Sequence, residues 1–423
     1  MKNVKVCLLH PPQHNVLDDK QYPPTGLMYI SSYLKSKGVD TKLVDLASLK
    51  EGEWKKKIIK ADLYGITCYT PSFTNVRKIA KACKEINPEA KIAVGGPHPT
   101  VLPEDTLKYG EFDSIVIGEG EEAMHKMAKE LGERGRIERM YTAPLIKNLD
   151  ELPFPDREDL NHEKYSMLIN GRHVTSIITA RGCPYNCSFC YKGLFGSKMR
   201  FRSVENVVAE VKECISKYNI KAFIFFDDIF AIHRKRLYEM LKEFEKLDIT
   251  FRCNGRAGIN NYEDFIKLKK AGCETVAFGI ESFSQGILDK CRKQVSVRQN
   301  IDVIKEANKA GLKSRAYMIF GLPGETEETV EETMKGIEES QPDNCGLTTF
   351  VPLPGSDVWN NPESYGVTIK SRNYDEYYTI GSDGTGGQVV RLDTLSDDEF
   401  SRLNKKLREF VNRYNRKKGS NDE

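Results

Sequence analysis

The stretch ARGCPYNCSFCYKG (180–193) carries three cysteines, Cys183, Cys187 and Cys190, separated by three and then two residues. Three thiolates on one tight loop can bind three irons of a four-iron cluster and leave the fourth iron open for a substrate or cofactor. Two other chemistries use the same residue type: a zinc ion bound by three cysteines and a water, and a redox pair formed by Cys187 and Cys190. The redox pair would leave Cys183 without a role, so the iron–sulfur cluster is the favoured interpretation.

The other cysteines are scattered, and the chain of 423 residues has eleven in all. An odd number in a long chain argues against a disulfide framework. The net charge of +3 provides no general field for nucleic acid. There is no apolar run of about 18 residues that would predict a membrane helix, and no secretory signal. We therefore expect a cytoplasmic monomer that binds neither nucleic acid nor membrane.

The elements that must hold the cysteine loop fall into two series, and the first occupies residues 1–135. Near-continuous apolar strands separated by helices indicate a parallel sheet covered on both faces. Five such strands predict a Rossmann-like domain, in which ligands bind at the carboxyl ends of the strands. No G-x-G-x-x-G follows the first strand, which argues against a dinucleotide site. The expected strands are VKVCLLH (4–10), TKLVDL (41–46), DLYGITCYT (62–70), KIAVGG (91–96) and DSIVIGEG (113–120).

Residues 136–172 are predicted as a connector, because they contain Pro153 and Pro155 and no sustained period. A second βα series follows in residues 173–360. Its six strands fall short of the eight units of a full TIM barrel, so we expect an open, partial (β/α)6 barrel. The cysteine loop follows the first of these strands, at the face where barrel enzymes carry out chemistry. The expected strands are 173–180, 221–228, 249–254, 274–280, 314–320 and 344–351.

Residues 361–423 are predicted as a C-terminal helical extension. Within it, residues 396–416 form one amphipathic helix, with Ser396 as its N-cap and acidic residues in its first turn. The tyrosine-rich stretch SRNYDEYYTIGSDGTGGQ (371–388) precedes this helix and either covers the barrel mouth or serves as a surface connector. The expected fold class is therefore α/β, with a Rossmann-like domain, a partial barrel and a helical tail.

The cysteine loop, with its C-x3-C-x2-C spacing after the first barrel strand, resembles that of the radical S-adenosylmethionine (SAM) superfamily. The barrel continues this resemblance in RFRSVENVVAEV (200–211), FFDDIF (225–230), GIESFSQGIL (279–288), FGLPGET (320–326) and VPLPG (351–355). The N-terminal half is similar to the cobalamin-binding domain fused to many such barrels. Its matching pieces are PPTGLMYISSYLK (23–35), VGGPHPTVLPE (94–104) and DSIVIGEGE (113–121).

Together the two halves resemble the class B, cobalamin-dependent radical SAM methyltransferases, a group that also includes cyclases. The resemblance implies a [4Fe–4S] cluster whose open iron binds SAM, and cleavage of SAM by one electron to methionine and a 5′-deoxyadenosyl radical. It also implies bound cobalamin, a small-molecule or natural-product substrate, and an external one-electron reductant such as flavodoxin or ferredoxin. The implied reaction is C-methylation of an unactivated carbon. The alternative is a non-methylating radical SAM cyclase, dehydratase or epimerase on the same scaffold.

Two residues near the cluster loop and the second strand are candidates for SAM binding through this resemblance. Phe189 precedes the last cysteine, where the family packs a side chain near adenine; a core aromatic is the alternative. Asp227 and Asp228 end the second strand and point to opposite faces, so at most one of them faces the site. Asp228 is the candidate for the SAM amino group, with a turn cap as the alternative.

Further candidates follow the next strands. Asn254 and Arg256 follow the third strand, where a guanidinium can pair bidentately with the SAM carboxylate; a surface salt bridge is the alternative. Glu281 closes the fourth strand, where a carboxylate suits the ribose hydroxyls; a structural ion pair is the alternative. Arg202 opens the helix after the cluster loop and can assist SAM binding, although Ser203 beside it is equally an ordinary helix N-cap.

The candidates for cobalamin lie at strand ends of the Rossmann-like half. Short hydroxyls and glycines there would cradle the nucleotide tail of the corrinoid, with ordinary turn chemistry as the alternative. His98 is expected to make a polar contact rather than to bind cobalt. None of the seven histidines follows an Asp by two residues, so the Asp-x-His-x-x-Gly motif of many cobalamin domains is absent. Either cobalamin binds without a histidine from that motif, or the domain has lost it. The other candidates are Thr70, Ser72, Gly95, Gly96, Glu119 and Gly120.

Overall fold

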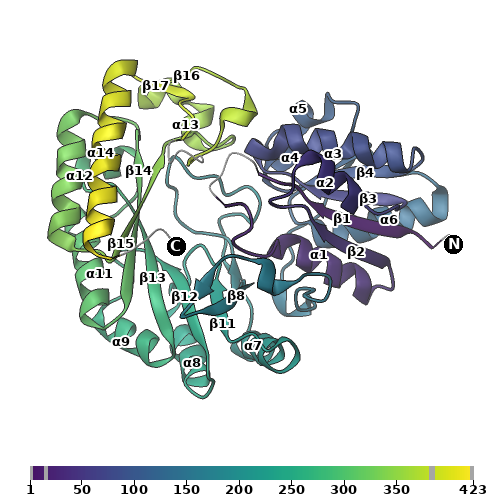
Figure 1. The fold of residues 1–423 in the computed structure, drawn as a ribbon, viewed down its shortest axis with the longest axis horizontal. Coiled ribbons are helices and arrows are strands. Elements are labelled where there is room, and N and C mark those ends of the chain that lie inside the picture. Colours follow the sequence, from purple (N-terminus) through teal and green to yellow (C-terminus); the bar gives the residue numbers. More distant parts are fainter. Residues whose placement is uncertain (1–2, 14–17, 381–385, 420–423) are drawn as a thin grey trace. The chain divides into compact units, whose positions relative to one another are not determined.

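The computed structural model describes residues 3–13, 18–380 and 386–419, and it divides the chain into two compact units (Figure 1). The N-terminal unit comprises Met1–Ser166, Tyr191–Phe201 and Asn373–Tyr378. The barrel unit comprises Met167–Cys190, Arg202–Arg372 and Thr379–Glu423. Two short segments from beyond residue 166, one of them directly after the last cysteine of the loop, are thus built into the N-terminal unit.

The core of the N-terminal unit is a six-stranded parallel sheet in the order β2-β1-β3-β4-β5-β6. The order reverses between β1 and β3, and open α/β sheets bind ligands outside the carboxyl ends of their strands at such a point. Five strands confirm the sequence prediction. The sixth, β6, lies in the predicted connector, and its three residues are too few to show an apolar run. The strands are β1 (Lys5–His10), β2 (Asp40–Asp45), β3 (Leu63–Thr67), β4 (Lys91–Gly95), β5 (Ser114–Ile117) and β6 (Met140–Thr142).

Helices cover both faces of this sheet. Along β1, Val6 and Leu8 point into the core shared with α1 and α6, while Cys7 and Leu9 point into the core shared with α2 and α3. One strand supplies both cores because successive side chains alternate between faces. The helices are α1 (Thr25–Ser36), α2 (Glu51–Trp54), α3 (Phe73–Ile86), α4 (Pro97–Val101), α5 (Pro103–Leu107) and α6 (Gly120–Arg134), with 3₁₀ turns η1 (Lys55–Lys57), η2 (Thr70–Ser72), η3 (Leu149–Glu151) and η4 (His162–Lys164); a short strand, β10 (Arg200–Phe201), also belongs to this unit.

The barrel unit is built on a seven-stranded sheet in the order β15-β14-β13-β12-β11-β8-β7. Six strands are parallel, and β7 forms an antiparallel hairpin with β8. In the described part of the chain the two edge strands, β15 and β7, do not pair with each other, so the predicted open, partial barrel is confirmed. The strands are β7 (Leu168–Ile169), β8 (Arg172–Ile177), β11 (Ala222–Phe225), β12 (Thr250–Gly255), β13 (Cys273–Glu281), β14 (Lys313–Phe320) and β15 (Asn344–Thr349).

Helices connect the successive parallel strands of this sheet and lie on its outer face (Figure 1). Five of them begin where a polar side chain accepts a backbone N–H of the first turn, at Ser203, His233, Asn261, Ser296 and Thr326. Across the described residues, no helix is long and apolar enough to cross a bilayer. The helices are α7 (Val204–Tyr218), α8 (Arg234–Phe244), α9 (Tyr262–Lys270), α10 (Gln285–Lys290), α11 (Val297–Lys309) and α12 (Glu327–Ser340).

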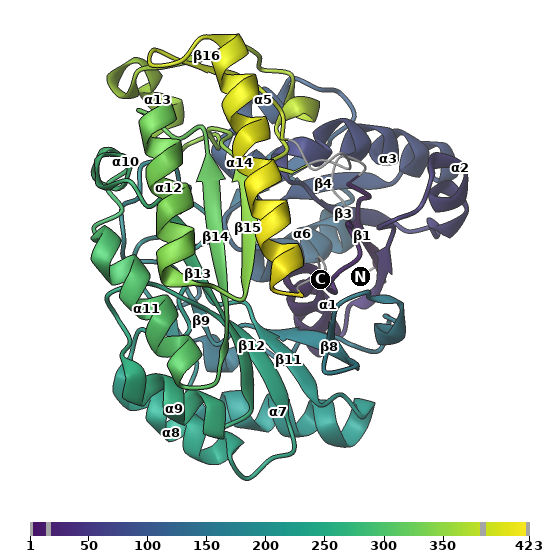
Figure 2. The same ribbon diagram turned by 60° about the vertical axis from the view of Figure 1, so that its left-hand side comes forward.

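The long C-terminal helix α14 (Asp397–Lys417) lies along the edge strand β15 (Figure 2). The side-chain amide of Asn415 accepts a hydrogen bond from the Cys345 N–H and donates one to the Cys345 carbonyl, both at 2.9 Å. These bonds satisfy backbone groups that an edge strand otherwise leaves open. Ser396 caps the helix, as predicted. The remaining elements are α13 (Asp357–Asn360), η5 (Pro362–Tyr365), β16 (Val367–Ile369), η6 (Tyr374–Glu376) and β17 (Val390–Leu392).

The tyrosine-rich stretch 371–388 is shared between the two units, and residues 381–385 lie outside the described part of the chain. Within the N-terminal unit, Tyr374 donates its hydroxyl hydrogen to Asp105 at 2.9 Å. Its ring meets those of His98 and Phe73 edge-on, with centroids 4.8 and 5.8 Å away. This part of the stretch is therefore a packed element of the N-terminal unit.

Candidate active site

The cysteine loop follows β8 and a short strand β9 (Ala180–Arg181), after the first parallel strand of the barrel unit. Backbone hydrogen bonds hold the middle of the loop from two sides. The Ser188 N–H donates to the Cys291 carbonyl at 2.9 Å, and the Ser188 carbonyl accepts from the Val358 N–H at 3.0 Å. Ser188 lies between two of the predicted cluster ligands, so these bonds position both of them.

Two of the three loop cysteines, Cys183 and Cys187, are half-buried, and Cys190 is exposed. Although part of Cys190 is open to solvent, loss of water around its sulfur raises the pKa of the thiol to about 12, and the charges of Cys187, Asp228, Cys183 and Glu281 add to the rise. Such a thiol keeps its proton until a metal displaces it. Bound iron would supply positive charge that offsets the neighbouring negative charges and stabilises the thiolate. The donor set therefore fits an iron–sulfur cluster.

The described residues do not form a site for a single metal ion. Within the ranges that the structure describes, no three His, Cys, Asp or Glu side chains converge on one ion. The thiolates that hold a four-iron cluster bind separate irons and have no need to converge.

Arg256, just beyond the end of β12, packs against the cysteine loop. Its guanidinium lies 3.7 Å from the centroid of the Tyr185 ring, and its Nη1 lies 3.9 Å from the Cys187 Sγ. Its Nη2 donates to the Lys293 carbonyl, and the residue is buried. The alternative for Arg256, a surface salt bridge, is thus not what the structure shows. The expected contact with the SAM carboxylate stays a prediction.

Glu281 ends β13 with a φ of +63°, in the left-handed region that costs a non-glycine residue about 1 kcal/mol. Its carboxylate is paired with the Lys293 ammonium, and the Nζ–Oε1 distance is 2.6 Å. Both side chains are about nine-tenths buried, with exposures of 7% for lysine and 11% for glutamate. Lys293 was missed by the sequence analysis, because a lysine in a loop twelve residues after Glu281 gives no local signal.

The adjacent aspartates at the end of β11 have separate environments, as the alternation of side chains predicts. Asp227 is buried, and its carboxylate accepts from the Thr179 N–H at 2.6 Å, the Ala180 N–H at 3.1 Å and the Thr179 hydroxyl. Asp228 is exposed and adds to the negative field at Cys190. Asn254 donates its amide to the Asp227 carbonyl at 3.2 Å. Asp228 is therefore the carboxylate of the two that remains available near the cluster loop.

Arg202 has local partners that the sequence did not reveal. Its guanidinium forms a buried ion pair with Glu210 and donates to Asn206 Oδ1 at 2.6 Å and to the Ile178 carbonyl at 3.0 Å. Ser203 beside it caps α7, accepting from the Asn206 N–H at 3.1 Å. These contacts anchor the helix start behind the cluster loop. Phe189 is half-buried, and its expected position near adenine stays a prediction.

At the carboxyl ends of β3 and β4, the structure brings Thr70 and His98 together, with 3.3 Å between Oγ1 and Nδ1. His98 is fully buried and its ring lies against Phe73, with centroids 4.4 Å apart. Burial lowers the pKa of His98 to about 4, so its ring is neutral near pH 7. Its Nε2 has no partner in the described structure. A buried nitrogen of this kind suits a polar group of a bound cofactor at the ligand-binding edge of the sheet.

The remaining strand-end candidates have contacts of their own. Ser72 bonds within its own 3₁₀ turn through its hydroxyl. Gly96 has a φ of +100°, which glycine adopts without strain, and a Cβ there would lie 3.1 Å from the Cys68 carbonyl oxygen. A Cβ at Gly120 would lie 2.7 Å from Ile30 Cδ1, so this glycine allows α6 to pack on α1. Gly95 is half-buried at the end of β4. Their roles toward cobalamin stay predictions.

Glu119 is buried in an ion pair that holds the segment after the cysteine loop. Its Oε2 lies 2.8 Å from Nη1 of Arg200 and accepts from the Ile146 N–H at 2.6 Å. Arg200 also donates to the Ile146 carbonyl at 2.6 Å. All three residues belong to the N-terminal unit. The contacts of this carboxylate are therefore structural, and its predicted contact with the corrinoid tail is untested.

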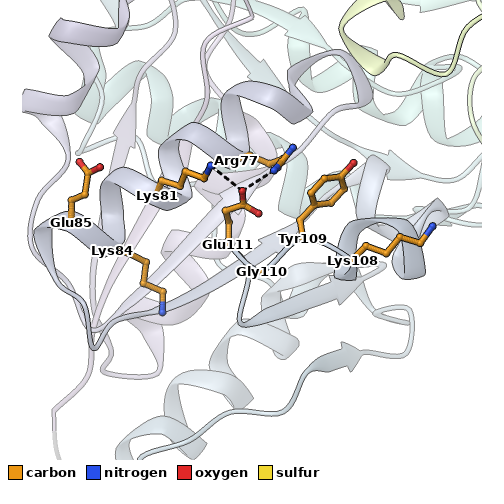
Figure 3. A pocket seen from close by; sticks show the side chains of 8 residues that line it. All are labelled: Arg77, Lys81, Lys84, Glu85, Lys108, Tyr109, Gly110 and Glu111. Carbon is orange, nitrogen blue, oxygen red and sulfur yellow. Dashed lines mark hydrogen bonds and ion pairs between the residues drawn. The ribbon is translucent and has the colours of Figure 1, made fainter.

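A surface hollow of about 730 Å³ lies on the N-terminal unit beside α3 (Figure 3). Its cations are matched by anions: Arg77 and Lys81 reach Glu111 at 2.8 and 3.3 Å, and Lys84 reaches Asp113 at 2.8 Å. None of the candidate cofactor residues lines it. The residues that line it are Arg77, Lys81, Lys84, Glu85, Lys108, Tyr109, Gly110 and Glu111.

Comparison with known proteins gives two family matches in one chain. Residues 177–337 match the radical SAM superfamily, and residues 19–128 match the B12 binding domain. An uncharacterized methyltransferase of Pyrococcus horikoshii, PH0819, is 33% identical over 96% of this chain and 92% of its own length. The anaerobic magnesium-protoporphyrin IX monomethyl ester cyclase of Rubrivivax gelatinosus is 30% identical over 88% of this chain and 72% of its own length.

Among solved structures, the fold is similar to that of the radical SAM methyltransferase TsrM from Kitasatospora setae, determined with cobalamin and a [4Fe–4S] cluster bound. The TM-score is 0.75 at 16% identity, over 96% of this chain and 89% of that one. With the three-cysteine loop in place after the first barrel strand, the chain belongs to the radical SAM enzymes that carry a B12-binding domain, and its cofactors are a [4Fe–4S] cluster, SAM and cobalamin.

Proposed function

We propose that the protein is a cobalamin-dependent C-methyltransferase that methylates an unactivated carbon of a small-molecule or natural-product substrate. The observation that carries the proposal is the near full-length similarity to a methyltransferase relative, which spans both cofactor-binding units. The cluster loop, the cations beside it and the small residues at the ends of the N-terminal strands support the same reading.

In this proposal the residues of the barrel unit hold the cluster and SAM. Cys183, Cys187 and Cys190 bind three irons. Arg256 offers a positive charge beside Cys187, and Glu281 offers a carboxylate that its ion pair with Lys293 orients. When bound, the cofactors supply a carbon-centred 5′-deoxyadenosyl radical and a transferable methyl group.

The residues of the N-terminal unit hold the corrinoid. Thr70 and His98 present a hydroxyl and an unpartnered ring nitrogen at the carboxyl ends of neighbouring strands. Gly95, Gly96 and Gly120 let the chain turn and the neighbouring elements pack closely at these strand ends, which shapes the edge that a large ligand would approach.

The proposal is tested with full-length protein, reconstituted anaerobically with iron, sulfide and cobalamin and given SAM and a chemical reductant. A methyltransferase forms S-adenosylhomocysteine as well as 5′-deoxyadenosine, and methyl-labelled SAM then marks a product in extracts of the source cells. Cys187→Ala is the matched control, because it removes the radical chemistry. Formation of 5′-deoxyadenosine without any S-adenosylhomocysteine, in protein that retains cobalamin, would exclude methyl transfer.

A second candidate is a non-methylating radical SAM cyclase, dehydratase or epimerase. The similarity to a cyclase at 30% identity favours it specifically. The same assay separates the two, because the second candidate consumes SAM without releasing its methyl group.

Radical SAM enzymes require an external electron source, and we propose a flavodoxin or ferredoxin for this chain. The odd number of cysteines, eleven, argues against a disulfide framework and suits a reducing compartment such as the cytoplasm. We further propose that the protein acts as a monomer.

A further inference from the structure

Arg252 places a buried positive charge on the inner face of the barrel sheet, opposite to the face that α8 covers. Its neighbour on β12, Phe251, points the other way and packs on Phe244 of α8, with ring centroids 5.8 Å apart. Because side chains alternate along a strand, Arg252 lies on the opposite, inner face. The residue is 6% exposed.

Among the described residues, Arg252 has one hydrogen-bond partner and no carboxylate within ion-pair distance. Its Nη2 lies 2.7 Å from the Tyr317 hydroxyl, and its Nε has no partner in the described part of the chain. The buried Arg202 instead pairs with Glu210, and the Arg200 side chain, which is 9% exposed, pairs with Glu119. A guanidinium is always charged, and burying it beside a neutral phenol alone costs free energy that those two ion pairs avoid.

The surroundings of Arg252 are polar and shaped to hold its partner. Arg315, two residues before Tyr317 on β14, lies with its guanidinium carbon 5.3 Å from the Tyr317 ring centroid. A Cβ on Gly346 of the neighbouring strand β15 would lie 2.9 Å from Tyr317 Cδ1, so this glycine leaves the room that the ring occupies. On the same face, Thr250 Oγ1 and Asn344 Oδ1 also lack partners among the described residues.

We propose that Arg252, Tyr317 and Arg315 bind an oxyanion of the substrate, a carboxylate or a phosphate group. The assignment rests on the proposed function, because it takes the inner face of the barrel as the place of the substrate. An oxyanion here neutralises Arg252, accepts from its free Nε and fits the planar donor fork of a guanidinium. The carboxylate of SAM carries the same chemistry, so the test must separate the two sources.

The first measurement is anion binding to the full-length protein with a reconstituted cluster and no SAM, by calorimetry with inorganic phosphate and with propionate. Wild-type protein should bind at least one of them, and Arg252→Met should weaken that binding at least about tenfold, because two charge-assisted hydrogen bonds are lost. Arg298→Met is the control, since Arg298 is exposed and paired with Asp302 on α11. Binding of neither anion, or equal binding by wild-type and Arg252→Met proteins, would overturn the proposal.

The second measurement is the sign of the stability change. The urea midpoint of the barrel unit is followed by Trp359 fluorescence in a Trp54→Phe background, because the chain has two tryptophans. Arg252→Met should raise the midpoint in the absence of anions, since an apolar side chain replaces an uncompensated charge. A lower midpoint than that of the background protein would show that Arg252 is structural.

The third measurement is SAM affinity. Arg252→Met should bind SAM as wild-type protein does. If Arg252→Met loses both SAM affinity and phosphate binding, the anion site belongs to the SAM carboxylate, and the proposed substrate class is overturned. None of these measurements needs turnover, so they stand apart from the test of methyl transfer.

Discussion

His10 and Asp45 form a histidine–carboxylate pair in the N-terminal unit, with 2.8 Å between Nδ1 and Oδ1. They come from adjacent parallel strands, β1 and β2, and are register partners at the last residue of each. The Tyr165 hydroxyl donates to the second carboxylate oxygen at 2.8 Å, and the Lys20 ammonium lies 3.6 Å from it. The carboxylate is ionised near pH 7, so the proton of the hydrogen bond belongs to His10 Nδ1. The pair therefore holds the imidazole in one orientation at the ligand-binding edge of the sheet.

This pair predicts how the stability of the N-terminal unit depends on pH. Burial raises the pKa of Asp45, but the hydrogen bond and charge of His10, with Lys20 and the Ala47 amide, outweigh it and lower the pKa to about 2. A depressed carboxyl pKa stabilises the fold above the unfolded value and loses that contribution as the pH falls toward 2. Asp45→Asn should cost about 2 kcal/mol at pH 7 and flatten the acid side of the profile between about pH 4 and pH 2.

The measurement is urea unfolding as a function of pH, followed by Trp54 fluorescence in a Trp359→Phe background. Asp40→Asn, an exposed residue at the start of the same strand, is the control and should leave the profile unchanged. A parallel shift of the Asp45→Asn curve at every pH would contradict the assignment of this carboxylate.

Replacing any of the three loop cysteines should lower the iron content of the protein, whereas replacing a cysteine elsewhere should not. Cys183→Ala, Cys187→Ala and Cys190→Ala should each fall well below about four irons per chain after anaerobic reconstitution and should lose SAM cleavage, because each removes one iron ligand. Iron and sulfide analysis and the absorption of the cluster report the result. Cys345→Ala removes a buried thiol on β15 and should keep its full iron content. Retention of iron by any of the three loop variants would exclude that cysteine as a ligand.

The position of Arg256 predicts a shift in the reduction potential of the cluster. Reduction adds one electron from the external donor, and the guanidinium beside Cys187 stabilises the added negative charge. Arg256→Met should therefore make the midpoint potential more negative, while Arg256→Lys keeps the charge and shifts it less. A redox titration followed by paramagnetic resonance, without SAM, measures this. An unchanged potential with full iron content and weaker SAM binding would favour the carboxylate of SAM as the partner of Arg256.

The buried pair of Glu281 and Lys293 predicts non-additive effects on stability and SAM affinity. Lys293→Met leaves a buried carboxylate unpaired and should cost about 3 kcal/mol, and Glu281→Gln leaves a buried ammonium unpaired. The double variant should be more stable than the sum of the two losses predicts, while SAM affinity falls in all three because the oriented carboxylate is lost. Urea unfolding and calorimetry with SAM, measured on wild-type protein, the two single variants and the double variant, complete the double-mutant cycle. Lys305→Met, which is half-exposed beside Glu339, is the control. Strict additivity would show that the two charges do not interact.

The amino-acid sequence by itself determined the cofactor chemistry and the order of the elements. The spacing of Cys183, Cys187 and Cys190 is a local property of one loop, and the alternation of apolar runs with amphipathic segments is local to each strand and helix. Both series of βα units could therefore be predicted, as could the cap of the last helix at Ser396. The sequence did not predict strand β6, because three residues with one buried side chain are too few to show a periodic pattern.

The tertiary structure decided which side chains meet, because each such contact joins residues far apart in the chain. No histidine of the sequence follows an Asp by two residues, yet Asp45 reaches His10 from the neighbouring strand, 35 residues away. Lys293 reaches Glu281 across a loop, and Tyr317 reaches Arg252 across the barrel sheet. Sequence patterns report the face on which a residue lies, but partners are set by strand order and register, which hydrophobic burial imposes on the whole sheet at once.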